Sequence, residues 1–285
     1  MRKLHQQNSG YTRDFKGLTA DRHHGSAFGL SVSSACTSAD GYTACWPVGM
    51  TTLLLINPNT SAHVTDLLAR HARALAPAGA TLHAVTAPFG EPYIATPAAA
   101  DTATRAVPAA WAAHLASHPV PGAVLVACFG DPGVAVLRAA TTVPVLGLAE
   151  VAMREADALA AADPAGRYAI VTGGAAWGPM LEVLAAQLGL AARLAGVVTM
   201  ERTGAELLAD PPAAEALLLG ACQQALALGG VRAIVIGGAA LADLAAPLAP
   251  RVPVPLIDNV RAGLRAAWHA ACTPGIHPST ETPRP

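Results

Sequence analysis

The stretch "AVLVACFGDPGVAVLRAATTVPVLGLAEVAMREA", residues 123–156, decides the fold. It starts with a short apolar run, passes through a turn of small residues and continues as an alanine-rich helical pattern. The order then repeats, with "VPVLG" at 143–147 as a second short strand and another helical run after it. Strands that are apolar on both faces and alternate with helices predict a parallel sheet covered by helices.

A second stretch, "AIVIGGAALADLAAPLAPRVPVPLIDNVRAGLRAA" at 233–267, has the same organisation. Both stretches consist of a strand, a small-residue turn, a helix, the triplet "VPV", an acidic residue and a further helix. We interpret the pair as an internal repeat. The chain is therefore predicted to contain two related α/β halves of about 100 residues each, which is an ordinary domain size.

The same patterns can be followed along the whole chain. Strands are expected at 52–57, 81–86, 123–128, 143–147, 168–172, 194–199, 233–237 and 254–257. Helices are expected near 61–76, 99–118, 132–140, 149–161, 176–188, 211–228, 240–248 and 259–271. The predicted fold class is α/β, with two pseudo-symmetric halves that each hold a parallel sheet flanked by helices. Ligands of such sheets bind at the carboxyl ends of the strands.

Composition changes near both ends of the chain. Residues 1–49 show neither hydrophobic period and predict a disordered extension, or one that results from a wrongly chosen start codon. Residues 273–285 are proline-rich and predict a loose tail. Between them, 50–150 together with 258–272 are expected to form the first half, because the last helix is predicted to pack back on it. Residues 151–257 are expected to form the second half.

Composition also excludes several classes of function. The chain has 285 residues, of which 53% are hydrophobic, 13% charged and 4% aromatic, with a net charge of −1. These values predict a sizeable core and argue against a nucleic-acid partner. No apolar run reaches the roughly 18 residues of a membrane span. With no convincing signal core either, we expect a cytoplasmic protein without membrane contact. The five cysteines form no CxxC pair, and the spacing of His63, His71 and His114 predicts no metal site.

Cys128 is the residue at which chemistry is expected. It ends a predicted strand, and Asp131 with the following proline is expected to open and cap a helix. The positive end of that helix would lower the pKa of the thiol, and Gly130 would let a substrate approach the backbone. The alternative is a buried packing residue, since free cysteine is among the most buried residue types. Cys222 and Cys272 fall inside helical patterns and are predicted to be core residues.

Two further turns are expected beside Cys128. In "INPNTS", residues 56–61, Ser61 can cap the next helix, and Asn57, Asn59, Thr60 and the helix amides offer donors for a carboxylate or imide oxygen. In "TGGAAWGPM", residues 172–180, Thr172 and Gly173 would complete a substrate pocket, because the stretch lacks the Lys-Ser/Thr of a phosphate loop. Ordinary turn and cap chemistry is the alternative for the first of these turns.

Together these motifs resemble the aspartate/glutamate/hydantoin racemase superfamily, and most closely its hydantoin racemase branch. The resemblance covers about 51–272 and rests on "INPNTS", "ACFGDPG", "GLAEVAM" and "VPVPLIDNV". It implies two flavodoxin-like halves with the active site in the cleft between them. It also implies racemisation or epimerisation, without cofactor or metal, of a small molecule with an activated α-hydrogen, such as a hydantoin or an amino-acid derivative. Cys128 would take the proton, and Asn57 with neighbouring amides would hold substrate oxygens.

The chain departs from this pattern at Gly238. Hydantoin racemases usually carry a second cysteine in a "GCAG"-like turn, which here reads "GGAA". Glycine cannot exchange a proton on the second face of the substrate, so another group, a water molecule or a reorienting substrate must serve. Two alternatives to a racemase therefore stay open: a single-thiol decarboxylase or lyase, and a small-molecule binder without turnover. The amides around Gly130, Gly173 and Gly238 would still form the substrate-binding wall, and a homo-oligomer stays open.

Overall fold

The computed structural model describes residues 36–37, 43–44, 51–202, 206–207 and 209–273. Residues 1–45 form one unit, in which β1 (Cys36–Thr37) and β2 (Thr43–Ala44) pair antiparallel. All other elements belong to a second unit, residues 46–285, to which the rest of this description is confined. The predictions for 1–49 and for the tail after Thr273 otherwise lie outside the described residues.

The first half of the second unit is built on a parallel four-stranded sheet. Its strands lie side by side in the order β4-β3-β5-β6. In chain order its elements are β3 (Thr52–Asn57), α1 (Ala62–Ala74), β4 (Thr81–Thr86), α2 (Pro97–Leu115), β5 (Ala123–Val126), α3 (Val134–Ala140) and β6 (Val145–Gly147).

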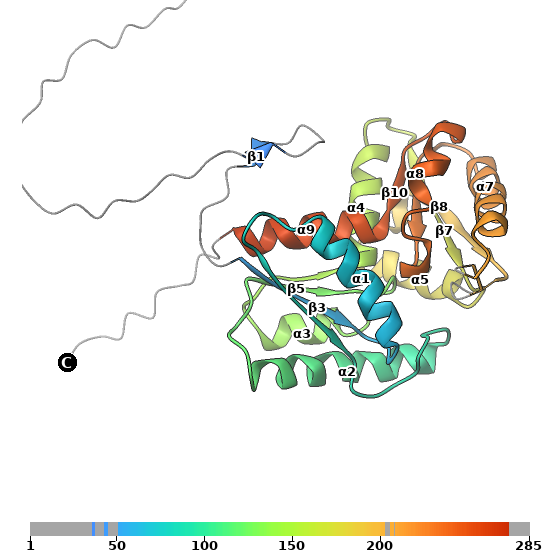
Figure 1. Cartoon of the computed structure of the whole chain (residues 1–285). Helices are drawn as coiled ribbons and strands as arrows, with labels where there is room; N and C mark the ends of the chain where they lie inside the picture. Colours follow the sequence, from blue (N-terminus) through green and yellow to red (C-terminus); the bar gives the residue numbers. More distant parts are fainter. Residues whose placement is uncertain (1–35, 38–42, 45–50, 203–205, 208, 274–285) are drawn as a thin grey trace, which may run out of the picture. The chain divides into compact units, whose positions relative to one another are not determined.

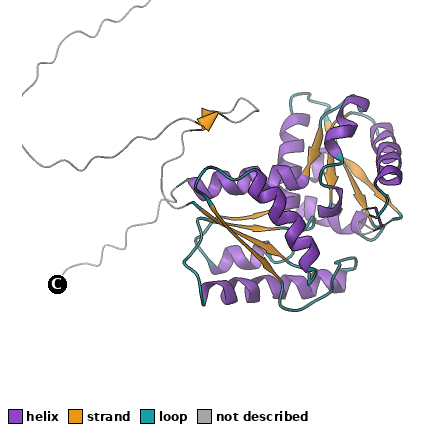
Figure 2. Cartoon of the chain, in the orientation of Figure 1, coloured by secondary structure: helices purple, strands orange, loops and turns teal. Residues whose placement is uncertain are grey.

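The second half contains another parallel four-stranded sheet, in the order β10-β9-β7-β8. Counted from the first strand of each half, both sheets have the order 2-1-3-4, so the predicted α/β fold with two pseudo-symmetric halves is confirmed (Figure 2). Its elements are α4 (Leu148–Ala160), β7 (Arg167–Gly173), α5 (Trp177–Gln187), η1 (Ala191–Arg193), β8 (Leu194–Met200), α7 (Pro211–Ala227), β9 (Val231–Gly237), η2 (Ala239–Leu241), α8 (Ala245–Leu248), η3 (Ala249–Arg251), β10 (Leu256–Asp258) and α9 (Asn259–Cys272).

The central strands are buried on both faces. Leu53 to Ile56 of β3 and Val124 to Val126 of β5 have no exposed surface. Alternate residues of β3 belong to different clusters, because Leu53 and Leu55 face α1 and α9 whereas Leu54 and Ile56 face α2. A sheet covered on both faces needs apolar residues at every position, which is why these strands read as continuous apolar runs.

Helices α4 and α9 are exchanged between the halves. Helix α4 follows the last strand of the first sheet but packs on β9 and β7 of the second sheet. Helix α9 follows the last strand of the second sheet and returns over β5 and β3 of the first (Figure 1). The two helices also pack against each other, so the halves are joined by a broad interface. The boundaries predicted for the halves stay a prediction, and the one at 150/151 lies inside α4.

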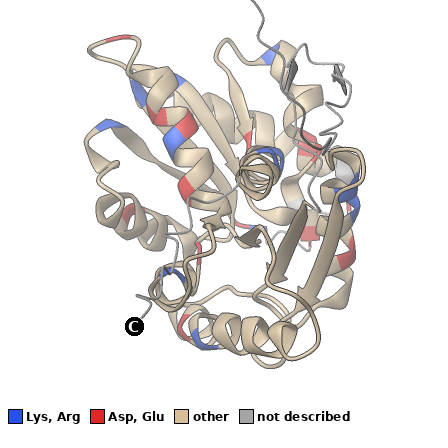
Figure 3. Cartoon of the chain, turned by 90° about the vertical axis from the view of Figure 1, so that its left-hand side faces the viewer, with Lys and Arg blue, Asp and Glu red and all other residues tan. Residues whose placement is uncertain are grey.

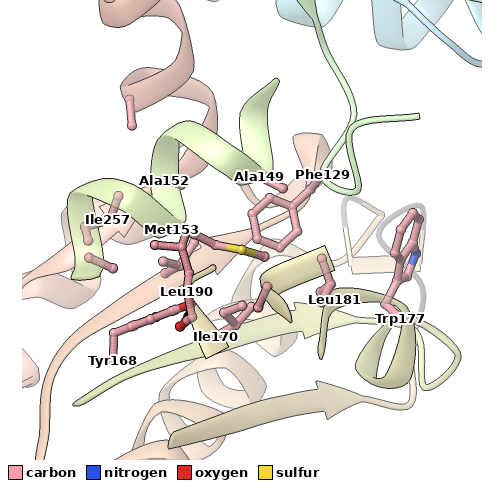
Figure 4. Close-up of a cluster of buried hydrophobic side chains, with 14 of the residues drawn as sticks. Phe129, Ala149, Ala152, Met153, Tyr168, Ile170, Trp177, Leu181, Leu190 and Ile257 are labelled. Carbon is pink, nitrogen blue, oxygen red and sulfur yellow. Dashed lines mark hydrogen bonds between the residues drawn. The ribbon is translucent and has the colours of Figure 1, made fainter. Parts of the chain in front are cut away.

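A hydrophobic cluster fills the space around α4 (Figure 4). Ala149, Ala152 and Met153 of α4 pack with Tyr168 and Ile170 of β7. The ring of Phe129, from the turn after β5, lies in the same cluster. The Tyr168 hydroxyl is buried and donates to the carbonyl oxygen of Leu190 at 3.1 Å, so its polar end is satisfied. This cluster holds the turn after β5 against the second half.

Two predicted elements differ from the structure. The strand predicted at 123–128 ends at Val126, which leaves Cys128 in the following turn. The helix predicted at 240–248 is wrong: a 3-10 turn, η2, leads to Asp243, which has a φ of 72°, and only the four residues of α8 are α-helical. A left-handed residue interrupts a right-handed helix, which explains the break.

Charged residues are sparse and of mixed sign along the described chain (Figure 3). Glu150 of α4 pairs with Arg138 at 2.8 Å and with Arg154 at 2.9 Å. Its side chain therefore serves an ion-pair network on the surface of α4. None of the described helices has both the length and the apolar character that a membrane span requires.

Candidate active site

A cavity of about 560 Å³ lies at the carboxyl ends of β5, β7 and β9, beside the turn after β3. Strands β3 and β5 are the first and third of the first half, and β7 and β9 are the first and third of the second. In a doubly wound sheet the strand order reverses between these two positions, and ligands bind at that point. The volume suits a small molecule. The cavity is lined by Asn59, Ser61, His63, Val64, Pro92, Tyr93, Ile94, Ala127, Cys128, Phe129, Thr172, Gly173, Trp177, Ala209, Gly237, Gly238, Ala239 and Leu241.

Cys128 lines this cavity from the turn after β5 and is half-buried. The turn folds back tightly on it, because the amides of Gly130 and Asp131 both donate to its carbonyl oxygen, at 3.0 and 3.2 Å. Cys222 and Cys272 are buried in α7 and α9, as predicted, and do not line the cavity. Of the three free cysteines in the described residues, Cys128 alone is placed to meet a ligand.

The pKa of the Cys128 thiol is raised, to about 12, first by burial and then by the nearby carboxylate of Asp131. The predicted lowering of this pKa is therefore wrong. Helix α3 begins only at Val134, with Gly133 in the left-handed region at its start (φ 81°). The loss of water and the negative charge outweigh any field of this seven-residue helix.

Asp131 also differs from its prediction, because it caps a different helix. Its carboxylate accepts from the amides of Ala149 at 2.9 Å and Glu150 at 2.7 Å, in the first turn of α4. A Cβ at Gly147 would collide with this carboxylate, so glycine there makes room for the contact. Burial raises the pKa of Asp131 to about 7, although the two amide bonds oppose the shift. The turn of Cys128 is thus anchored to the helix that covers the second sheet.

Of the three side chains predicted as donors in the "INPNTS" turn, only Asn59 lines the cavity. Asn57 is fully buried, and its side-chain amide donates to the Asn59 side chain at 2.8 Å and to the Thr65 hydroxyl at 3.0 Å. The amide of Thr60 donates to the carbonyl oxygen of Glu91 at 3.0 Å. Neither Asn57 nor Thr60 lines the cavity, whereas Asn59 and Ser61 do. Asn57 therefore stabilises the turn through these buried hydrogen bonds.

The second half contributes Thr172, Gly173 and Gly238 to the cavity, all three predicted near a ligand. The Thr172 hydroxyl donates to the carbonyl oxygen of Gly237 at 2.9 Å and ties the ends of β7 and β9 together. Gly238 has a φ of 119°, which side chains rarely adopt. A Cβ built on it would find no atom closer than Leu241 Cγ at 3.9 Å. A side chain would fit in the space at this position, but the backbone conformation favours glycine.

At two other glycines, the absence of a side chain makes room for an aromatic ring from the other half. A Cβ at Gly130 would collide with the ring of Trp177 from α5, and a Cβ at Gly237 would collide with the ring of Phe129. Gly130 therefore does not line the cavity but lies against Trp177, which does. Both contacts join a first-half turn to the second half and form part of the cavity wall.

Three backbone amides near Cys128 and Gly238 border the cavity without a described acceptor. Within the described part of the chain, no acceptor meets the N–H groups of Cys128, Phe129 or Gly238. All three residues line the cavity. Unpaired amides beside a thiol are suited to bind an oxygen on which negative charge develops.

Sequence reasoning missed several lining residues. The sequence predicts Ser61 only as a helix cap, and it predicts no metal site from the spacing of His63, yet both residues line the cavity. Tyr93 and Trp177 come from a loop and from the start of α5, and no sequence spacing connects them with Cys128. Across the described ranges, one group of His, Cys, Asp or Glu side chains is close enough to hold a metal ion, and it lies outside this cavity.

The sequence model of the family described as Asp/Glu/hydantoin racemase matches residues 53–267, which include both sheets and the cavity. The chain belongs to this family. It is therefore an isomerase of the racemase type, as predicted. Among the described cysteines of this racemase, Cys128 in the turn after β5 is the one that lines the cavity.

Relatives of this racemase support the assignment. The hydantoin racemase of Paenarthrobacter aurescens is 30% identical over 215 residues, which cover 75% of this chain and 89% of the relative. That of Rhizobium meliloti is 32% identical over 219 residues, covering 75% and 86%. The solved allantoin racemase from Klebsiella pneumoniae superimposes with a TM-score of 0.69 at 30% identity, covering 77% and 86%. Arylmalonate decarboxylase shares the fold, with a TM-score of 0.53 at 18% identity.

Proposed function

We propose that this chain is a cofactor-independent racemase or epimerase that exchanges a proton at the activated α-carbon of a hydantoin or a related amino-acid derivative, with Cys128 as the proton-transfer group. The observation that carries the proposal is the position of Cys128 in a cavity between the two halves of a racemase fold. The relatives that are 30–32% identical and covered over 86–89% of their own length bear the names hydantoin racemase and allantoin racemase. A hydantoin and allantoin share a five-membered imide ring with one such carbon.

The raised pKa of Cys128 has two opposite effects on such a reaction. With a pKa of about 12, roughly one thiol in 10⁴ is ionised at pH 8, so the reactive form is scarce. The thiolate that does form is a strong base, which suits a carbon-bound proton of low acidity. In the proposed step the thiolate takes the α-proton, the C–H electron pair moves into the adjacent carbonyl group, and an enolate forms.

The enolate oxygen requires donors that are already in place. The N–H groups of Cys128, Phe129 and Gly238 offer three, and they come from both halves of the cavity wall. The oxygen of the Asn59 side chain accepts from Asn57 at 2.8 Å and from the Ser61 amide at 2.9 Å, which leaves its NH₂ group to face a ligand. We assign oxygen binding to this amide and these N–H groups.

Racemisation is completed when a proton reaches the opposite face of the planar enolate. Gly238 stands where a second thiol would belong and supplies no proton. Among the described lining residues, His63 and Tyr93 are the remaining side chains that titrate. We assign the second proton to solvent admitted beside Gly238, where open space leaves room for water. The Cys128 thiol then gives the proton it took to solvent, which restores the thiolate.

The test is an incubation of single enantiomers in D₂O. Purified protein is given one enantiomer each of several 5-substituted hydantoins, allantoin and free amino acids, with heat-inactivated protein as the control for spontaneous racemisation. We expect at least one cyclic substrate to lose optical rotation and to gain one deuterium at the α-carbon without release of CO₂. Release of CO₂ with label only in the product would point to a decarboxylase. Binding without exchange across the panel would reject the enzymatic proposal.

A further inference from the structure

Three histidines that are far apart in the sequence meet at one edge of the first sheet. His83 lies in β4, His114 in the last turn of α2 and His118 just beyond that helix. Their ring centroids are 4.6 to 5.1 Å apart, and one nitrogen of each lies within 4.8 Å of the others. None of the three lines the candidate active site. We call them the histidine cluster.

The fold brings the cluster together for reasons visible in the backbone. β4 is an edge strand, and His83 is paired in register with Leu54, whose side chain faces α2. The amide of His118 donates to the carbonyl oxygen of His114 at 3.0 Å, which continues the helical turn beyond α2. The rings of His114 and His118 are consequently stacked, with their planes 3° apart.

His114 is a buried polar side chain without a partner. It is 4% exposed, and neither ring nitrogen reaches hydrogen-bond geometry with a described residue. A buried polar atom with no partner is costly, and a bound ion would remove that cost.

We propose that His83, His114 and His118 bind a divalent transition-metal ion, with Zn²⁺ as the best match, through three imidazole nitrogens and one position open to solvent. Imidazole is a preferred ligand of Zn²⁺, which accepts three protein ligands and a water molecule. Nitrogens at about 2.0–2.1 Å from a tetrahedral zinc would lie roughly 3.3 Å apart, somewhat closer than the present limit of 4.8 Å. His118 is exposed and His83 half-buried, so both rings can turn to close this gap.

In His118, Nδ1 lies 2.9 Å from the Ser117 hydroxyl, so Nε2 is the ring nitrogen left to bind the metal. A hydrogen bond on the other ring nitrogen is the usual way in which a metal-binding histidine is held. The ion would join the end of α2 to the edge strand β4. It would lie toward the amino end of that strand, away from the carboxyl end that leads to the cavity, so its effect is on stability.

Zinc titration of the chelator-treated full chain without an affinity tag tests the proposal. A Cys128→Ser background removes the cavity thiol as a competing ligand. We expect one equivalent of Zn²⁺ by calorimetry, visible d–d bands of tetrahedral Co²⁺, and a rise of the unfolding temperature of about 5–10 °C at free zinc near 100 times the Kd. His83→Gln and His118→Gln should each weaken binding at least ~10-fold. His269→Gln, an exposed histidine at the end of α9, is the matched control and should bind like the parent.

His118→Gln keeps the test valid if His83→Gln fails to fold, because His118 is exposed. The proposal is overturned if the parent takes up no zinc, if Co²⁺ gives no tetrahedral bands, or if both cluster variants retain the parent affinity. Retained affinity would assign the ion to other histidines of the chain. These readouts do not depend on racemase activity.

Discussion

The turns after β5 and β9 occupy equivalent places in the two halves but are held in opposite ways. In the first turn, Asp131 reaches outward and caps α4 through the amides of Ala149 and Glu150. In the second turn the support comes from outside, because the Asn259 side chain donates to the carbonyl oxygens of Ile236 at 2.7 Å and Gly238 at 3.3 Å. The first turn therefore carries its own carboxylate beside the thiol, whereas the second is held by the start of α9.

This difference shows how one topology provides two unlike walls of a cavity. The order of strands brings both turns to the same place, and the residues within each turn decide what it can do. The first turn combines a thiol whose pKa is raised first by burial with a carboxylate that raises it further. The second offers a glycine, an unpaired amide and open space. The substitutions below test this asymmetry.

The largest effect is expected from Cys128→Ser. A serine hydroxyl is a far weaker acid than a thiol, so proton transfer should fall by about 10²–10⁴-fold, the usual contribution of a positioned acid–base group. Chiral chromatography of the substrate found in the D₂O assay measures this. Cys272→Ala, which alters a cysteine away from the cavity, should retain activity. More than a tenth of the parent rate in Cys128→Ser would remove this thiol from the mechanism.

Gly238→Cys should be the next largest change, and in the opposite direction. A second thiol facing Cys128 would supply the missing proton carrier and raise the racemisation rate by about 10- to 100-fold. The φ of 119° should cost stability, of the order of 1–3 kcal/mol. Gly238→Ala has the same backbone cost without the thiol and is the matched control. Equal rates for the alanine and cysteine variants would contradict the assignment of the second face to Gly238.

Gly237→Ala should disrupt the contact between the two turns. The added methyl group would collide with the Phe129 ring, so the halves must shift at the cavity. We expect a loss of about 1–3 kcal/mol in the free energy of unfolding, measured by denaturant titration. Gly220→Ala is the control, because a Cβ in this part of α7 meets no atom within 4 Å. There alanine should stabilise the helix by up to about 1 kcal/mol. A neutral Gly237→Ala would show that the ring contact is dispensable.

The smallest effect concerns the ionisation of Cys128. Because its pKa lies at about 12, alkylation by iodoacetamide should rise about tenfold per pH unit from pH 7 to 10 without a plateau. Asp131→Asn removes the negative charge that favours the protonated thiol, so its pKa should fall and alkylation at pH 9 should be several-fold faster. Peptide-resolved mass spectrometry separates Cys128 from the other cysteines. A plateau near pH 8 in the parent would mean that burial does not raise this pKa.

The sequence by itself determined the eight strands of the two sheets, the repeated order of the halves, and the matching positions of Cys128 and Gly238 next to the carboxyl ends of β5 and β9. These features follow from local periods of apolar residues and from small residues at turns, which are legible along the chain. The family resemblance rested on the same motifs and is confirmed by the family match over 53–267.

Only the tertiary structure decided the pKa of Cys128 and which side chains lie next to one another. It showed that Asp131 caps α4, and that Asn57 and Thr60 do not line the cavity whereas Asn59 does. It also reversed the expected pKa shift of Cys128 and brought His83 beside His114. The physical reason is common to all of these. Desolvation, charge–charge interaction and side-chain contact depend on distance in space, and chain spacing does not encode the distance between residues on different elements.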